Sequence, residues 1–142
     1  MKNIETQYRS LIKELLDAPF KPDRTGTGTY SLFGKTLEHD MSAGFPLLLS
    51  KKVSFKAAKF ELLWILQGRT DMKYLRDNGI NYWDDDYKRS GRTDGTLGPV
   101  YGKQWRDFNG VDQLQRIIMG IMTKPESRRL VVNAWNPPEL HQ

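Results

Sequence analysis

The chain has 142 residues, of which 38% are hydrophobic and 27% are charged, a composition that permits one globular domain with an apolar core. Its 22 Lys and Arg against 17 Asp and Glu give a net charge of +5, which favours an anionic small molecule as partner. Nucleic acid is less favoured, because the basic residues are dispersed. The sequence has no cysteine, which excludes disulfides, thiol catalysis and cysteine-based zinc sites within it, and its two histidines suggest no metal site. No apolar run is long enough to cross a bilayer, so we expect a cytoplasmic protein without membrane attachment.

The first third of the chain is predicted to hold one helix followed by short strands. Apolar residues at helical spacing predict an amphipathic helix over residues 3–17: Tyr8, Leu11, Ile12, Leu15 and Leu16. Residues 20–28 are polar and rich in Gly and Thr, which predicts a loop. Residues 29–41 resemble two strands separated at Gly34, and residues 45–49 resemble a short buried run.

The remainder of the chain predicts further helices and a final strand. Residues 54–67 predict an apolar helix that ends at Gly68, and Thr70 is the expected N-cap of a shorter helix closing at Asn78. Residues 84–98 have no periodicity and predict a loop. Apolar spacing from Val111 to Ile121 predicts another amphipathic helix, and residues 129–135 are typical of a buried strand. We therefore expect an α+β fold, a mixed sheet covered by helices, over residues 1–142.

The predicted last strand makes this fold incomplete by itself. A strand as apolar as residues 129–135 needs hydrogen-bonded neighbours at its edges and cover on its faces. Few residues follow Trp135 in the sequence. We therefore expect the fold to need a further C-terminal part, and the isolated chain to be only marginally folded.

Glu61 is the most unusual residue of the predicted helices. Its neighbours three and four positions away are all apolar: Ala57, Ala58, Trp64 and Ile65. A carboxylate in such surroundings is desolvated and suited to exchange protons near neutral pH. The alternative is a surface glutamate that reaches Lys56 or Lys59, and helical spacing alone favours neither.

Three arginines could bind an anion. Arg24 lies in a loop of small residues, where a guanidinium can clamp a phosphate, although a plain surface turn is the commoner case. Arg128 and Arg129 open the predicted last strand, where adjacent side chains point to opposite faces. A shared phosphate would therefore require both arginines to precede regular pairing. Pairing with Asp or Glu is the structural alternative.

Four segments in this order resemble the N-terminal part of the thymidylate synthases: DRTGTGT at 23–29, FELLW at 60–64, GPVYGKQWR at 98–106 and SRRLVVNAWN at 127–136. The resemblance covers nearly the whole chain. It implies the fold of that family and its reaction, the reductive methylation of dUMP to dTMP. In that reaction 5,10-methylenetetrahydrofolate supplies both the carbon and the hydride, and no metal takes part.

The resemblance also implies roles for particular residues. Glu61 matches the glutamate that organises water and proton transfer, and Tyr101 matches a tyrosine near the reacting base. Arg24 matches a phosphate ligand, and Arg128 with Arg129 matches a pair that reaches the nucleotide phosphate of the partner subunit in a homodimer. For the folate, Lys51 matches a lysine at the glutamate tail and Trp83 a tryptophan that packs nearby. Ser54 stands where many members have a histidine, and Asp86 replaces a second tryptophan.

The family's nucleophile is a cysteine shortly after the segment that resembles residues 138–140, and this sequence has none. We therefore expect the chain alone to be inactive. It would be half of a split enzyme or a truncated reading frame, completed by a C-terminal part that carries the cysteine. Two alternatives stay open: a non-catalytic module that binds nucleotide or RNA, and part of a pyrimidine-nucleotide hydroxymethylase.

Overall fold

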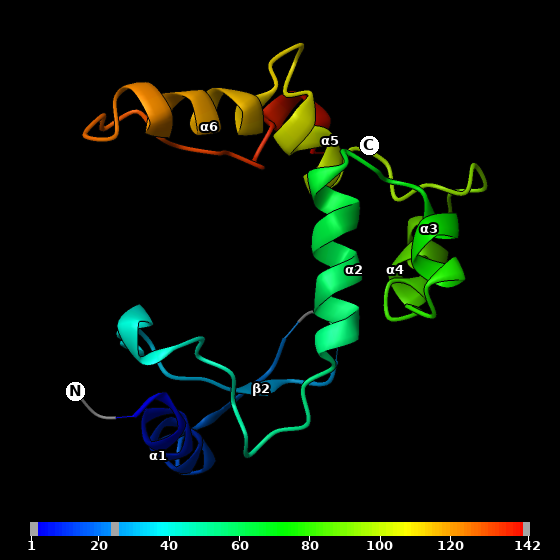
Figure 1. Ribbon diagram of the computed structural model, residues 1–142. Coiled ribbons are helices and arrows are strands. Elements are labelled where there is room, and N and C mark those ends of the chain that lie inside the picture. The colour runs from blue at the N-terminus through cyan, green and yellow to red at the C-terminus, as the bar shows by residue number, and fades with distance from the viewer. Residues whose placement is uncertain (1–2, 24–25, 141–142) are drawn as a thin grey trace. The chain divides into compact units, whose positions relative to one another are not determined.

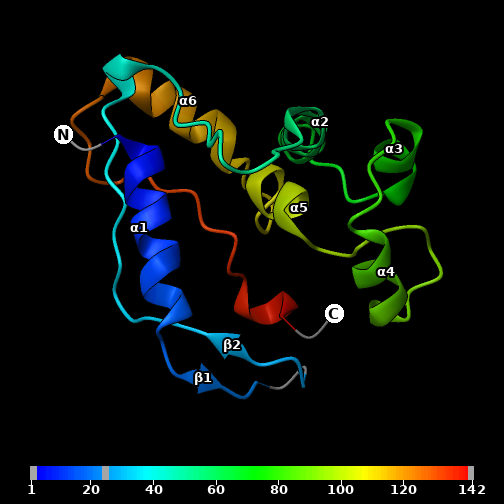
Figure 2. The same cartoon turned by 90° about the horizontal axis from the view of Figure 1, so that it is seen from below.

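The computed structural model describes residues 3–23 and 26–140. The chain divides into two compact units, residues 1–53 and 54–142, and each is described by itself. Figure 1 shows the course of the chain, and Figure 2 also labels strand β1. The prediction of a single domain over residues 1–142 stays a prediction.

The first unit consists of helix α1 (Ile4–Leu16), a two-stranded antiparallel sheet and a short 3-10 turn (Met41–Ala43). The predicted helix is confirmed, and the Asn3 side chain caps it by accepting the Glu5 N–H at 2.8 Å. Strand β1 (Phe20–Lys21) pairs with β2 (Thr29–Tyr30), and Phe20 packs edge-on against Tyr30. Side chains of α1 then bind the following segment, since Gln7 exchanges two hydrogen bonds with the Glu38 backbone.

The second unit is helical in the part that the structure describes. Its helices are α2 (Phe55–Leu66), α3 (Met72–Asp77), α4 (Asp84–Ser90), α5 (Tyr101–Arg106) and α6 (Gln113–Thr123), followed by a 3-10 turn (Pro137–Glu139). Helix α5 lies at the C-terminal end of α2 and leads into α6, as both views show (Figures 1 and 2). From α6 the chain turns back, and residues 129–133 run alongside that helix.

The core of this unit forms around Trp64, which is fully buried. Met72 and Leu75 of α3 pack against it, together with Ile80 and Leu97. The indole N–H of Trp64 donates to the Asp71 carbonyl at 2.9 Å, so the one polar group of the buried ring has a partner. Two backbone hydrogen bonds, Met72 N to Gly95 O and Leu97 N to Thr70 O, close the same corner.

Several predicted elements differ from the structure. The N-cap of α3 is Asp71, whose carboxylate accepts the Tyr74 N–H at 3.0 Å, and the prediction of Thr70 was wrong by one residue. Residues 84–90 form a helix, although no apolar periodicity predicts one there. Its support is electrostatic: three aspartates in the first turn face the positive end of the helix dipole, and Lys88 and Arg89 pair back to Asp85 and Asp86.

The strand predictions were also wrong in detail. The expected loop at 20–28 begins with strand β1, and of residues 29–41 only Thr29 and Tyr30 are paired. The expected buried run at 45–49 is largely exposed, with Phe45 at 72% and Leu49 at 85%. Residues 129–135 form no strand. The side chain of Gln113 occupies the place of a neighbouring strand, since it accepts from Asn133 N and donates to Asn133 O.

Gly102 permits the contact between α5 and the end of α2. A Cβ built on Gly102 would lie 2.3 Å from the Arg69 carbonyl oxygen, and backbone cannot swing aside as a side chain can. We expect Gly102→Ala to destabilise this unit by about 2 kcal/mol or more, by overpacking. Urea unfolding followed by tryptophan fluorescence measures this, because all four tryptophans lie in residues 54–142.

Gly120→Ala is the matched control. There the nearest atom to a new Cβ is Leu130 Cδ2 at 2.6 Å, the end of a flexible side chain, and Ala favours a helix by roughly 0.8–1 kcal/mol over Gly. Equal costs for the two variants would contradict the proposed backbone contact at Gly102.

The pairing of Asp71 with Arg69 should make the stability of this unit depend on pH in the acid range. The Arg69 guanidinium, followed by the Tyr74 N–H, lowers the pKa of Asp71 below its ordinary value of 3.8. A carboxyl with a lowered folded-state pKa stabilises the fold above its unfolded pKa and loses that contribution as pH falls through the folded value. We therefore expect the urea concentration at the unfolding midpoint to decrease as the pH drops below about 4. Asp71→Asn should make that decrease smaller. Asp85→Asn, in an exposed pair with Lys88, should cost less than about 0.5 kcal/mol at neutral pH. An unchanged acid profile in Asp71→Asn would contradict the assignment.

Candidate functional site

Glu61, Trp83 and Tyr101, predicted from three separate segments, lie together in the second unit. The half-buried indole of Trp83 donates its Nε1–H to Glu61 Oε1 at 2.7 Å. The Tyr101 and Trp83 rings pack in an edge-type contact, with centroids 6.4 Å apart. Glu61 comes from α2, Trp83 caps α4 and Tyr101 begins α5, so the cluster joins three helices.

The contacts of Glu61 differ from those expected of a surface glutamate paired with a lysine. In the part of the chain that the structure describes, no ion pair joins Glu61 to Lys56 or Lys59. Its partner is instead the indole of Trp83, which itself packs on the buried Trp64 with ring centroids 6.3 Å apart. A charge-assisted hydrogen bond of this length fixes the direction of the carboxylate.

Tyr82 belongs to the same cluster and was missed by the sequence analysis. Its ring lies 6.3 Å from that of Trp83. Burial, and secondarily the neighbouring Glu61 carboxylate, raise the pKa of the Tyr82 phenol far above its usual range. The phenol therefore stays protonated beside the carboxylate. Only its position next to Trp83 could have pointed to it, since a lone tyrosine before a helix carries no functional signal.

A buried polar network ties the end of the described chain to α5. The residues Gln104 and Asn136 are both 2% exposed, and Asn136 Nδ2 donates to Gln104 Oε1 at 3.1 Å. Both amides also donate to Glu139 Oε2, Gln104 at 2.6 Å and Asn136 at 3.0 Å. The network holds residues 136–139 against the helix that begins with Tyr101. No periodicity or motif in the sequence singled out these three residues together.

Five further residues were predicted for the site: Arg24, Lys51, Ser54, Arg128 and Arg129. Arg24 lies outside the described residues. Lys51 is exposed in the first unit, beside Tyr8 and Lys13, and its unit is described by itself. Ser54 caps α2, its Oγ accepting the Ala57 N–H at 3.3 Å. Arg128 and Arg129 lie in an exposed turn, so strand alternation does not separate them.

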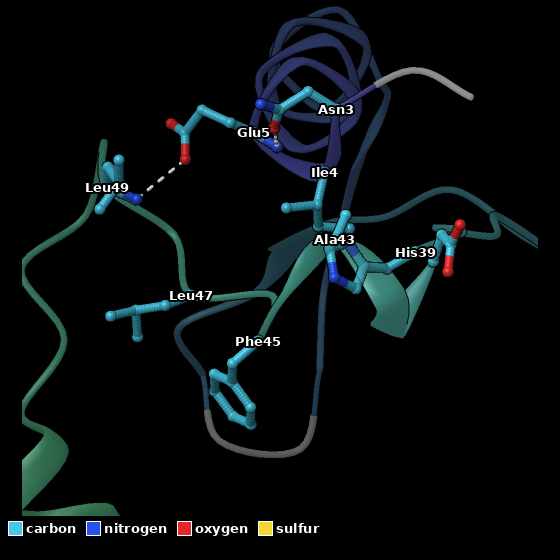
Figure 3. A pocket seen from close by; sticks show the side chains of 9 residues that line it. Asn3, Ile4, Glu5, His39, Ala43, Phe45, Leu47 and Leu49 are labelled. Atoms are coloured by element: carbon cyan, nitrogen blue, oxygen red, sulfur yellow. Dashed lines mark hydrogen bonds between the residues drawn. The ribbon is translucent and has the colours of Figure 1, made fainter.

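The first unit has a pocket of about 440 Å³, and none of the predicted site residues lines it. Figure 3 shows Ile4, Phe45 and Leu47 around it, and the bond from Leu49 N to the Glu5 carboxylate. Glu5 also accepts from Ser50 N at 3.0 Å. Hydrogen bonding from the Ser50 side chain, followed by the Leu49 N–H, lowers the pKa of Glu5. The Glu5 carboxylate thus joins α1 to residues 49–50, which is a structural role.

Residues 3–23 and 26–140 contain neither a side-chain cluster for a metal ion nor a membrane-spanning helix. No group of three or more His, Asp or Glu side chains there is placed to hold a metal ion. None of the helices in those residues combines the length and apolar character needed to span a membrane.

Comparison with known proteins supports the resemblance noted in the sequence. A family model described as thymidylate synthase matches residues 6–142. The chain belongs to the thymidylate synthase family. A curated thymidylate synthase of Mycoplasma mobile is 44% identical over 160 aligned residues, which cover 94% of this chain and 56% of the relative.

The solved structures agree with this assignment and with the predicted fold. The crystal structure of thymidylate synthase from T4 phage matches with a TM-score of 0.84 and 44% identity, over 95% of this chain and 51% of that one. The thymidylate synthase fold expected from the sequence is therefore confirmed. The chain spans about half the length of these relatives.

Against the thymidylate synthase family pattern, Asp86 stands where a tryptophan is common. In the structure Asp86 is exposed and pairs with Arg89 at 2.6 Å, so this position holds a surface ion pair on α4. The Trp83 ring therefore keeps its contacts to Glu61 and Tyr101 without a second tryptophan beside it.

The bond between Trp83 and Glu61 can be observed directly. We expect the Trp83 indole N–H resonance to lie downfield of the other indoles in a ¹H–¹⁵N spectrum, and Glu61→Met to move it upfield, because the charged acceptor is lost. Glu61→Gln should move it less, since an amide oxygen still accepts. The double variant Lys56→Met with Lys59→Met is the control and should leave it in place. A shift in that control equal to the one in Glu61→Met would favour the lysine-paired surface glutamate.

Proposed function

We propose that this chain is the N-terminal part of a thymidylate synthase and contributes the proton-transfer group to the methylation of dUMP by 5,10-methylenetetrahydrofolate. The observation that carries the proposal is the meeting of Glu61, Trp83 and Tyr101. Each was expected from a different segment at the reacting base or the folate, and three helices bring them to one place. A surface glutamate would give no such convergence.

Within that reaction Glu61 has the role of moving a proton near the pyrimidine. The Trp83 N–H holds Oε1, and the carboxylate keeps further acceptor positions for a water or the base. Trp83 thus has two functions, since its indole fixes the carboxylate while its ring offers a face to the folate. Tyr101, at the start of α5, packs against the same ring with the two planes at 61°.

The phosphate and folate ligands complete the proposed site. Arg24, Arg128 and Arg129 bind the nucleotide phosphate, the latter two by reaching a partner subunit in a homodimer. Lys51 meets the glutamate tail of the folate. Ser54 caps α2, and its hydroxyl is a weaker folate ligand than the histidine common at that position.

The first step requires a thiolate that adds to the pyrimidine, and no cysteine occurs in these 142 residues. The nucleophile must therefore come from outside them, and the 142 residues alone should not turn over dUMP. The complete enzyme is expected to act in the cytoplasm.

Complementation tests this proposal. The chain is mixed with a second chain that carries the part of the Mycoplasma mobile enzyme not matched here, and dUMP-dependent dihydrofolate formation is recorded. We expect neither chain alone to be active and the mixture to turn over. Glu61→Gln should lower kcat about 100-fold or more while dUMP affinity stays within a few-fold.

Lys59→Met, a neighbour of Glu61 on α2 outside the proposed site, is the matched control and should keep the parent rate. A Glu61→Gln mixture within twofold of the parent would refute the proton-transfer role. A mixture without turnover, although the two chains bind each other, would refute the proposed function.

A further inference from the structure

The buried polar network of the second unit joins helix α5 to the turn that contains Glu139. One carboxylate oxygen, Glu139 Oε2, accepts from Gln104 Nε2 at 2.6 Å and from Asn136 Nδ2 at 3.0 Å. Gln104 Nε2 also donates to the Pro99 carbonyl at 2.8 Å, which ties the network to the residues before α5. Figure 1 shows the turn, in red, beside α5. The network therefore fixes this turn to a helix of the candidate site.

One buried atom of this network lacks a donor. Asn136 is 2% exposed. Its Nδ2 group faces three acceptors: Gln104 Oε1, Asn109 Oδ1 and Glu139 Oε2. These acceptors decide the orientation of the amide, because a reversed amide would point its oxygen at three other oxygens. Among the residues that the structure describes, Asn136 Oδ1 then has no hydrogen-bond partner. Leaving a buried acceptor unpaired is costly, so this oxygen needs an N–H or O–H donor from elsewhere.

The turn itself is stiff. Pro137 and Pro138 each have a backbone φ angle fixed by the ring, and Glu139 N donates to Asn136 O at 2.9 Å, which closes the turn. A stiff turn that is bonded to a helix leads the residues after it away in one direction.

The partners of Glu139 indicate that its carboxylate gives direction to the network. Within residues 3–23 and 26–140, no Lys or Arg forms an ion pair with Glu139, and the groups that it binds are neutral amides. Gln104 lies three residues after Tyr101 on α5, which is about one helical turn. The carboxylate thus connects the helix that begins with Tyr101 to the chain that continues at Leu140.

We propose that this network positions the nucleophile: the C-terminal part donates a hydrogen bond to Asn136 Oδ1, while Glu139 holds the chain that leads to the cysteine against α5. This rests on the proposed function, in which the cysteine lies outside these 142 residues. Asn136 and Glu139 are positioning residues, because they act through the place of the thiolate. A misplacement of about 1 Å at a reacting group can cost roughly 100-fold in rate.

The hydrogen bond to Asn136 can be followed by NMR in the isotope-labelled 142-residue chain. When the second chain of the complementation mixture is added, we expect the Asn136 side-chain carbonyl carbon to move downfield, because accepting a hydrogen bond deshields that carbon. The Gln104 side-chain carbonyl carbon is the internal control and should stay in place, since its oxygen already accepts from Asn136. An Asn136 resonance that stays in place would overturn the proposal.

Turnover of the mixture measures the positioning. Asn136→Leu and Glu139→Leu should each lower kcat about tenfold or more while KM for dUMP stays within about threefold, because the thiolate is displaced and the nucleotide contacts are kept. Glu139→Gln should recover most of the rate, since its amide oxygen can accept the same two hydrogen bonds. Asn78→Leu is the matched control: it removes an amide that donates to Tyr74 O in the same unit, and kcat should stay within about twofold. Tryptophan fluorescence checks that each variant folds.

Three kinetic outcomes would also overturn the proposal. The first is a parent rate in Asn136→Leu. The second is a raised KM with unchanged kcat, which would assign the network to nucleotide binding. The third is an equal loss in Glu139→Gln and Glu139→Leu, which would mean that the charge matters and the hydrogen bonds do not. A parent mixture that binds without turnover would refute the proposed function instead, and the Asn136 carbon shift would still decide the hydrogen bond.

Discussion

The second unit depends on the burial of the Trp64 indole, whose N–H is its one polar group. Trp64 is fully enclosed, and an indole N–H without a partner in such a place would cost about 1–3 kcal/mol. The Asp71 carbonyl satisfies it, which requires the chain to turn back directly after α2. The same turn puts the Asp71 carboxylate at the start of α3, where it caps the helix and accepts two hydrogen bonds from Arg69, from Nε and Nη2. A single buried ring therefore sets the corner from which the rest of the unit is built.

The candidate site follows from that corner by helical geometry. Glu61 lies three residues before Trp64, so it occupies a neighbouring position on the same side of α2. The Trp83 ring covers Trp64 and reaches Glu61 with its own N–H. Helix α5 can approach the end of α2 closely only because Gly102 has no side chain against the Arg69 carbonyl. That approach brings Tyr101 to the Trp83 ring. The proposed proton-transfer residue is thus held by the core and not by a loop.

Sequence reasoning succeeded where a local pattern, either apolar spacing or a capping residue, specifies the helix. The three long helices carry apolar spacing or a capping residue of their own, and Glu61 stood out because its helical neighbours are apolar. It failed where support is not apolar. Helix α4 is stabilised by aspartates at its first turn and ion pairs along its surface, which periodicity does not detect. Tyr82 and the Gln104 network depend on residues far apart in sequence, and no local pattern brings Gln104 to Glu139.

The wrongly predicted strand shows the same distinction at the level of hydrogen bonds. Residues 130–132 have the side chains of a strand, yet strand structure also needs a neighbouring backbone. In this unit the Gln113 amide supplies both bonds at Asn133, and the Asn136 Nδ2 group donates to Gln104 and Glu139. Side-chain amides therefore hold the segment in an extended course without a sheet. These bonds begin at Asn133, and in the turn before them Arg128 and Arg129 are exposed, with no ion pair to another described residue. The placement of the amides thus determines which arginines are free to bind an anion.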